Sequence, residues 1–313
     1  MDVLTDLLER ARAHGAAFSH STVHGPFGLT FPAVSGLAVH AIVEGEVQLW
    51  TDDPAQPLRL IGGDIVLVRG GLEHQLATSG DEACRPLADY MATARVSDRR
   101  YLAGEDGDAS VFCCGAYLFE GDVCTELLRV LPDTIRLRPA AGSQLRTTLD
   151  LLAREMEQDL PGQQTLLDRL LDVALVQMLR EHFAAASDTP GWYRASGDPQ
   201  LGPALRAVHA DPARPWTVES LAAEAALSRA AFARRFTAAL GMAPLAYVTG
   251  WRMALAREQL RDTSDQIAAV ASALGYASEF SFAAAFKRHH GVAPGRWRAN
   301  ARAGRSPSLS AAR

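Results

Sequence analysis

One stretch of this chain recurs fifty residues later, and that repeat constrains the fold more than any other feature. The first copy, residues 216–236, reads WTVESLAAEAALSRAAFARRF. This pattern predicts a helix, a tight turn and a second helix, with Thr217 and Ser228 as the N-caps. Phe232 and Phe236 stand four residues apart, so they share one face of the second helix. Small and basic residues occupy the other face, which suits both the DNA major groove and an ordinary helical hairpin.

The second copy, residues 270–298, reads VASALGYASEFSFAAAFKRHHGVAPGRWR. When the first copy is extended to residue 248, five of its residues have an identical partner in the second: Ser228 and Ser278, Phe232 and Phe282, Phe236 and Phe286, Gly241 and Gly291, Pro244 and Pro294. The second copy has one extra residue in its turn, where Gly275 and Tyr276 stand. Glycine adopts a positive φ at low cost, which suits such a turn. A repeat at a fixed offset indicates two copies of one supersecondary unit.

Two such units joined by a helix are similar to the AraC/XylS family of bacterial transcription regulators. The motifs that carry this resemblance are WTVESLA, SRAAFARRF, GMAPLAYVTGWRMALA and GYASEFSFAAAFKRHHGVAPGRWR. The resemblance covers about residues 199–300. It implies that the second helix of each unit enters a major groove, and that the two grooves lie on one face of the DNA, one helical turn apart.

The same resemblance implies which side chains face DNA. Ala230, Ala233 and Arg234 would face bases in the first groove, and Phe280, Ala283 and Ala284 would face bases in the second. The full predicted DNA-binding set is Ser228, Arg229, Ala230, Ala233, Arg234, Arg235, Thr237, Ser278, Glu279, Phe280, Ser281, Ala283, Ala284, Lys287 and Arg288.

Two positions depart from the family pattern. Ala226 stands where a turn glycine is common, so we expect strain of about 1 kcal/mol in that turn. Ala284 stands where a base-reading arginine is often found. The second unit is therefore expected to read sequence more weakly than the first.

Charge is distributed unevenly along the chain. Residues 197–313 hold 15 basic and 8 acidic side chains, a net charge of +7, whereas the remainder carries −12 within an overall −5. A basic C-terminal part beside an acidic N-terminal part fits a nucleic-acid module with an attached regulatory domain. The sequence has neither a signal-peptide pattern at its N-terminus nor an apolar run long enough to span a membrane, so we expect a cytoplasmic protein.

The first half of the chain has a different texture. After a predicted amphipathic helix at residues 2–14, short β-branched and aromatic runs alternate with turn residues up to about Leu137, which predicts an all-β domain. GDIVLVRGGLEH at 63–74 is similar to the second cupin motif, and VHAIVEGE at 39–46 resembles the end of the first. With GPFGLTF and LLRVLPDTIRL, these motifs resemble the cupin-type sensor domain of some AraC-family regulators, over about residues 2–185.

Two histidines are the candidate ligand-binding residues of this barrel. His40 has the strand parity of an inward-facing residue, and His74 matches the usual ligand of the second cupin motif. Two histidines fall short of the three protein ligands typical of catalytic zinc, and His20, His24 or Cys114 are the candidates to complete such a site. We expect a small-molecule effector contacted by His40 and His74, with no fixed cofactor; a metal ion is the less favoured alternative.

The cysteines favour a reduced compartment. Cys84, Cys113, Cys114 and Cys124 form no zinc-type CxxC, and the vicinal pair makes a poor disulfide. Because side chains alternate along a strand, one member of that pair faces the interior of the β domain in either register. We interpret it as apolar filler; thiol-based redox sensing remains the alternative.

The rest of the chain divides by composition. The predicted domains are a cupin-like sensor at 1–138, a helical dimerisation and connector segment at 139–186, a linker at 187–199, a DNA-binding domain at 200–300 and a disordered tail at 301–313. A wide apolar stripe along 167–179 suits both the barrel surface and a homodimer seam. The fold class is therefore α+β and multidomain: a small β-barrel with flanking helices, then an all-α double helix-turn-helix.

These patterns predict a sequence-specific regulator of transcription that binds double-stranded DNA and has no enzymatic activity. We expect it to be an activator, to contact RNA polymerase and to form a homodimer. A signal sensed in the barrel would shift DNA occupancy by linkage. The alternative from another class is a metal-dependent cupin enzyme, such as a dioxygenase, fused to a helical domain. The missing His-x-His of the first cupin motif and the doubled helix-turn-helix argue against it.

Overall fold

The computed structural model describes residues 3–11, 14–53, 55–118, 131–158, 160–186 and 189–303. These form two compact units. The helical unit contains the described residues of 1–10 and 188–313, and the barrel unit contains those of 11–120 and 126–187. The predicted disordered tail lies mostly outside the described residues, which end at Ala303.

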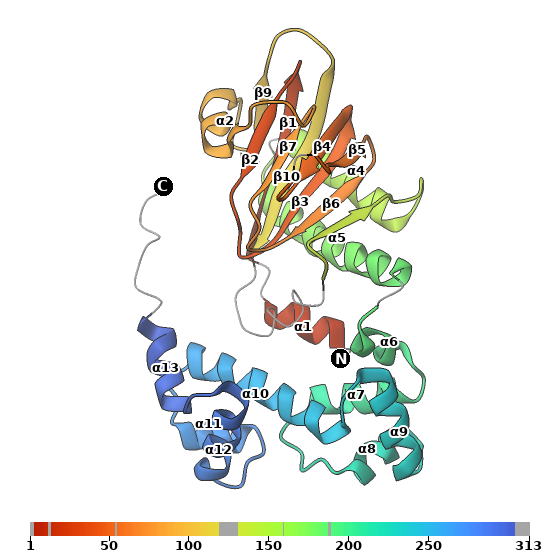
Figure 1. Ribbon diagram of the computed structural model, residues 1–313, viewed down its shortest axis with the longest axis vertical. Helices are drawn as coiled ribbons and strands as arrows, with labels where there is room; N and C mark the ends of the chain where they lie inside the picture. The colour runs from red at the N-terminus through yellow and green to blue at the C-terminus, as the bar shows by residue number, and fades with distance from the viewer. Residues whose placement is uncertain are drawn as a thin grey trace. The chain divides into compact units, whose positions relative to one another are not determined.

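The helical unit is built from the N-terminal helix and the C-terminal part of the chain (Figure 1). Its helices are α1 (Val3–Ala11), α6 (Gly191–Gly197), α7 (Leu201–Ala210), α8 (Val218–Glu224), α9 (Arg229–Leu240), α10 (Pro244–Asp262), α11 (Ile267–Ala273), α12 (Glu279–His290) and α13 (Pro294–Ala303). The predicted repeat is confirmed, because α8–α9 and α11–α12 are the two helix-turn-helix pairs and α10 connects them.

The core of the helical unit follows the repeat. Phe232 and Phe236 on α9, and Phe282 and Phe286 on α12, are all buried in one continuous apolar cluster. Burial of a phenylalanine side chain contributes about 2–3 kcal/mol. The long helix α10 adds Trp251 to the same cluster, so both pairs pack on it.

The N-terminal helix α1 packs into this core far from its neighbours in sequence. Val3 belongs to the apolar cluster, and the buried carboxylate of Asp6 lies 2.6 Å from Nδ1 of His209 on α7. Nε2 of the same ring lies 2.7 Å from the hydroxyl oxygen of Tyr247 on α10. This three-residue hydrogen-bonded chain ties α1, α7 and α10 together.

Part of the predicted linker, 187–199, is also helical in the structure. Helix α6 occupies residues 191–197, and its Trp192 and Ala195 pack on the apolar cluster of the helical unit. The alpha carbon of Gly191 comes so close to α9 that an added Cβ would lie 2.2 Å from the carbonyl oxygen of Ala239. Composition alone misses this segment because its few apolar residues are spread among turn formers. The predicted domain boundaries stay a prediction.

The barrel unit consists of two sheets (Figure 1). The six-stranded sheet has the order β11-β6-β3-β10-β1-β9, and the five-stranded sheet has the order β5-β4-β7-β2-β8. Their strands are β1 (His14–His24), β2 (Gly28–Phe31), β3 (Gly36–Glu44), β4 (Glu46–Trp50), β5 (Leu58–Ile61), β6 (Ile65–Arg69), β7 (His74–Ala77), β8 (Arg85–Pro86), β9 (Arg100–Ala103), β10 (Ala109–Leu118) and β11 (Thr134–Leu137). The short helix α2 (Leu87–Ala94) follows β8.

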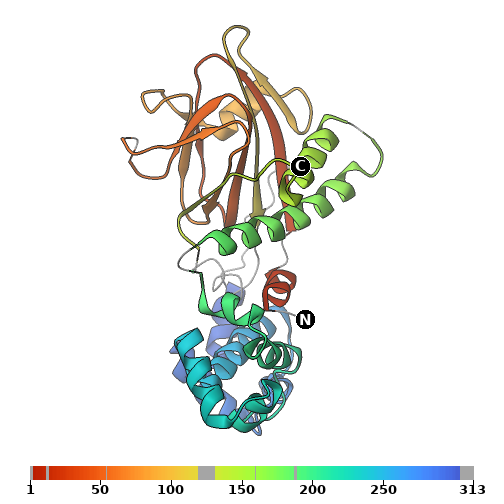
Figure 2. The same ribbon diagram turned by 90° about the vertical axis from the view of Figure 1, so that its right-hand side faces the viewer.

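The two faces of the six-stranded sheet have different partners. On β10, Phe112 and Cys114 point into the core shared by the two sheets, where Phe112 stacks on Phe27. The intervening Cys113 points to the opposite face, as strand alternation requires. That outer face is covered by α4 (Gln144–Glu157) and α5 (Gln163–Ala185), as Figure 2 shows.

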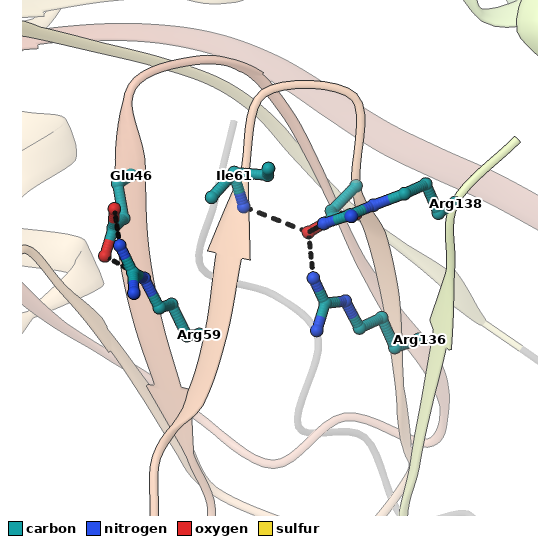
Figure 3. A network of polar contacts seen from close by, with 6 residues as sticks. Glu46, Arg59, Ile61, Arg136 and Arg138 are labelled. Carbon is teal, nitrogen blue, oxygen red and sulfur yellow. Dashed lines mark hydrogen bonds and ion pairs between the residues drawn. The ribbon is translucent and has the colours of Figure 1, made fainter. Parts of the chain in front are cut away.

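A buried carboxylate fixes the start of β6 (Figure 3). Asp64 accepts a hydrogen bond from the Ile61 backbone N–H at 3.0 Å. It also accepts hydrogen bonds from Arg136 and Arg138, both at 2.6 Å. Burial alone would raise the pKa of Asp64, but the hydrogen bonds from Arg138, Ile61 and Arg136 lower it. The carboxylate therefore stays ionised and holds the end of β11 beside β6.

Candidate nucleic-acid interface and barrel interior

Both second helices begin with a side-chain cap. Ser228 Oγ accepts from the backbone N–H of Ala231 at 3.3 Å, and Ser278 Oγ accepts from that of Ser281 at 3.2 Å. Each helix ends at a glycine with positive φ, 73° for Gly241 and 78° for Gly291. These caps fix where α9 and α12 start and stop, and hence which side chains face outward.

The predicted DNA-binding residues all lie on the surface of α9 and α12 or at their caps, with only Ala233 and Ala283 partly covered. Two of the predicted arginines are held by acidic neighbours within the helical unit. Arg229 pairs with Glu219 at 3.0 Å, and Arg235 pairs with Asp198 at 2.8 Å. Within the described part of the chain, Arg234 has no ion pair. Of these three arginines, Arg234 is therefore the one whose guanidinium can reach a base edge without breaking an existing bond.

Helix α12 presents an unusual surface. Phe280, in its first turn, is 84% exposed, while Phe282 and Phe286 on the opposite face are fully buried. Ala284 beside it is also exposed. The exposed ring of Phe280 contributes little to the folded core and is accessible to an apolar partner. Lys287 and Arg288 follow about two turns after Phe280, where cations suit phosphates.

The first turn is strained as the sequence predicts. Ala226 has φ 51°, a left-handed conformation that costs a non-glycine residue about 1–2 kcal/mol. Gly275 occupies the equivalent place in the second turn with φ 77°. A Cβ there would lie 2.1 Å from the carbonyl oxygen of Ala213, so only glycine fits.

Inside the barrel, the two predicted histidines lie side by side. Nε2 of His40 is 2.7 Å from Nε2 of His74, and Nδ1 of His40 is 2.8 Å from Sγ of Cys114. Phe31 stacks on the His74 ring at 5.1 Å between centroids. Sequence reasoning placed both rings inward and named Cys114 as a possible companion, but spacing alone does not give these contacts.

The hydrogen bonds define a direction through this cluster. Nδ1 of His74 faces the carbonyl oxygen of Leu72 at 3.5 Å, which favours a proton on that nitrogen. With that tautomer, His74 Nε2 accepts from His40 Nε2, and Nδ1 of His40 accepts from the thiol of Cys114. Burial lowers the pKa of His74 to about 4, and it lowers the pKa of His40 well below its usual range. Both rings are therefore neutral at pH 7.

This arrangement does not fit a three-ligand metal centre. Cys114 contacts the nitrogen of His40 that points away from His74, so the three donors do not converge on one point. No group of three histidine, cysteine or acidic side chains among the described residues is placed to hold a metal ion. His24 instead faces the carbonyl oxygen of Gly107 at 3.4 Å.

The cluster does not fit a thiol sensor either. Burial raises the pKa of Cys114 well above its usual range and that of Cys113 to about 12. A reactive sensor cysteine needs the opposite shift and access to solvent. Cys124 lies outside the described residues.

Comparison with known proteins agrees with this geometry. Residues 2–184 match a family described as cupin, and residues 221–300 match a helix-turn-helix domain family. A putative AraC-like transcription regulator from Streptomyces antibioticus is 33% identical over 303 residues, which cover 95% of this chain and 98% of that protein. The chain belongs to the AraC-like transcription regulators.

Another regulator matches over a similar length, and a solved DNA-binding domain matches the C-terminal part alone. The HTH-type transcriptional regulator MtrA of Neisseria gonorrhoeae is 31% identical over 304 residues, covering 95% of this chain and 98% of that protein. A crystal structure of the DNA-binding domain of AdpA in complex with a target DNA is 32% identical, with a TM-score of 0.33, and covers 35% of this chain and 97% of that chain. The cupin and helix-turn-helix family matches and the AraC-like relatives identify the chain as a DNA-binding transcription regulator with a cupin-like N-terminal domain. They favour this function over that of a cupin enzyme.

The described helices contain none that is both long enough and apolar enough to cross a membrane.

Proposed function

We propose that α9 and α12 enter two successive major grooves of an operator and read it by different chemistry. The exposed ring of Phe280 carries this proposal. An apolar side chain in the major groove contacts the C5-methyl group of thymine. Phe280, with Ala283 and Ala284 on the same outward face, therefore favours thymine in the second half of the operator.

The first recognition helix reads by hydrogen bonding. Arg234 lies on the exposed face of α9, and its guanidinium has the planar fork that fits O6 and N7 of guanine. Arg229 and Arg235 already hold ion pairs with Glu219 and Asp198, so they are better suited to phosphates at the edge of the contact. Because Arg234 is assigned to a base edge, we expect a guanine in the first half of the operator.

The connecting helix supports binding on a single face of DNA. Helix α10 has 19 residues, which corresponds to a length of about 28 Å. One turn of B-DNA spans about 34 Å. Two recognition units held at the ends of such a helix can reach grooves one turn apart without bending the DNA by a large angle.

Regulation is the second part of the proposal. The barrel unit senses a signal in the cytoplasm, and the bound state favours one arrangement of the two units, which changes operator occupancy and contact with RNA polymerase. Activation is the expected direction. The chain acts by binding and does no chemistry on its ligand, as the names of its relatives support.

A homodimer is the expected assembly. Helix α4 buries Leu152, and α5 buries Leu171 and Met178, against the barrel, while another side of each helix is exposed. Leu151, Leu166 and Val173 are exposed there. Two chains joined through this apolar surface would bind two half-sites with a gain in apparent affinity.

Selection of bound sequences from random double-stranded DNA with the full-length protein tests the DNA reading. The expected result is two enriched elements about 10 base pairs apart from centre to centre, one containing guanine and one rich in thymine. Enrichment of a single element, or none, would overturn the proposal of two reading helices.

A further inference from the structure

A cavity of about 70 Å³ lies on the outer face of the six-stranded sheet, beneath α4 and α5. Its floor is made by β3, β6 and β10, which contribute side chains that alternate with those pointing into the barrel. Val39, Ala41 and Cys113 form this floor. The cavity is thus separated from the His40–His74 pair by the thickness of one sheet.

The lining is mostly apolar. From the helices, Leu152, Leu171, Ala174 and Met178 close the cavity, and all four are buried. Burial raises the pKa of the Cys113 thiol to about 12, so this side chain is neutral at physiological pH. The cavity is partly open at its Arg146–Asp150 rim, and its apolar inner walls favour an apolar guest.

The polar groups around the cavity are already satisfied by one another. Tyr117 donates its hydroxyl to the carbonyl oxygen of Leu171 at 2.8 Å. At the rim, Arg146 donates to Asp150 at 3.0 Å, and Asp64 is held by Arg136 and Arg138 (Figure 3). A charged ligand would have to break one of these bonds to find a partner, whereas an uncharged apolar ligand breaks none.

We propose that this cavity binds a small, uncharged, apolar molecule and is the effector site of the protein. Its volume is about half that of an engineered 150 Å³ cavity that binds benzene. A xenon atom or a hydrocarbon of a few carbons fits as the cavity stands, and a single aromatic ring fits when α5 shifts outward.

The position of the cavity allows a shift of α5 to affect DNA binding. This coupling rests on the proposed function. Leu171, Ala174 and Met178 are side chains of α5, so a guest that enlarges the cavity displaces this helix. Helix α5 ends at Ala185, only a few residues before the helical unit begins. Displacement of α5 therefore acts on the segment that joins the two units.

Binding is tested on the full-length protein without DNA. Xenon-129 NMR reports occupancy, and thermal unfolding is followed with benzene and, in parallel, with benzoate, its charged counterpart. Saturable xenon exchange and a rise in Tm of about 3–6 °C at ten times the Kd of benzene, with no rise for benzoate, are expected. The absence of saturable binding, or equal effects of benzene and benzoate, would overturn the proposal.

Substitutions locate the site. Ala174→Leu on α5 and Ala153→Val on α4 each add side-chain volume inside the cavity and should abolish both signals. Ala184→Leu makes the same change as the first variant at an exposed position of α5 and should retain them. Because the second filling variant is the milder one, it guards against a simple failure to fold. Benzene binding that survives both filling variants would place the ligand elsewhere and contradict the assignment.

A third arm separates this inference from the proposed function. Operator affinity without ligand tests DNA reading by itself. Addition of benzene should change that affinity at least about five-fold in wild type and in Ala184→Leu, but not in Ala174→Leu. If benzene binds in the cavity and operator affinity is unchanged, the cavity is not the effector site.

Discussion

The two helix-turn-helix units have the same interior and different surfaces. Their buried aromatic pairs, serine caps and terminal glycines coincide at an offset of fifty residues. The turn residue differs, since Ala226 in the first unit corresponds to Gly275 in the second. The outward face differs too, since Ala230 and Arg234 correspond to Phe280 and Ala284. The shared positions are restricted because substitutions in a packed core lower the free energy of unfolding. Surface positions lack this restriction, so the outward faces can differ in the DNA contacts we propose for them.

The two units also differ in what supports them. The first packs against α6 and α7, and α7 is tied to α1 by the Asp6–His209 hydrogen bond. The second ends in α13, whose Trp297 packs near Phe286. The first unit therefore depends on the N-terminus of the chain, which encodes no part of the repeat.

Asp6→Ala is the substitution with the largest expected effect. It leaves a buried donor of His209 without its acceptor, which costs about 1–3 kcal/mol for a neutral group and more for a charged one. Urea unfolding measures the destabilisation, and hydrogen exchange locates it. Amides of α9 should lose more protection than those of α12. Equal loss of protection in both helices would mean that α1 supports the whole helical unit rather than the first pair.

Gly275→Ala should destabilise the protein by about 2–3 kcal/mol, because the new Cβ meets a carbonyl oxygen in a left-handed turn. The midpoint of urea unfolding is the measurement. Gly250→Ala on α10, where an added Cβ meets nothing within 4 Å, is the matched control and should be neutral or slightly stabilising. A neutral Gly275→Ala would show that the second turn is not tightly packed on Ala213.

Arg234→Ala should weaken binding by about 1–3 kcal/mol and flatten base preference in the first half of the operator. Lys287→Ala should weaken binding to all sequences similarly and lower the slope of log K against log salt by about one unit. Binding across an operator library at two salt concentrations measures both. An intact preference profile in Arg234→Ala, or an altered one in Lys287→Ala, would reverse the roles given to these residues.

Ala226→Gly should raise stability by up to about 1 kcal/mol, since relief of the left-handed strain is partly offset by the greater backbone entropy of glycine. Thermal unfolding shows this as a higher Tm. Ala230→Gly, at an exposed helical position of α9, is the control and should lower Tm by a similar amount. A lower Tm for Ala226→Gly would mean that the turn holds alanine without strain.

The sequence predicts the local features of the two helix-turn-helix units but not the contacts between distant segments. The repeat, its caps and its buried phenylalanines follow from spacing, and so does the strain at Ala226, because they depend on local backbone and helix periodicity. The Asp6–His209 contact spans 203 residues and has no periodic signal. The ion pairs of Arg229 and Arg235 likewise depend on where neighbouring elements end.

In the barrel, too, the sequence predicts the direction of side chains but not their contacts. Strand alternation is enough to place His40 and His74 inward and to put Cys113 and Cys114 on opposite faces. It does not fix which nitrogen faces which atom, and those contacts keep His40, His74 and Cys114 from converging on one point. The cavity beneath α4 and α5 arises where a helical pair meets a curved sheet, so its shape depends on packing between distant segments.

The most direct test of the account replaces thymine by deoxyuridine, which lacks only the C5-methyl group, in one half of the operator at a time. In wild type, replacement in the second half should weaken binding by about 0.8 kcal/mol for each methyl group that Phe280 no longer meets, and replacement in the first half should have no effect. In Phe280→Ala, the second half should no longer distinguish thymine from deoxyuridine. Wild-type binding that is unchanged by deoxyuridine in the second half, or a Phe280→Ala protein that still senses it, would contradict apolar reading by α12.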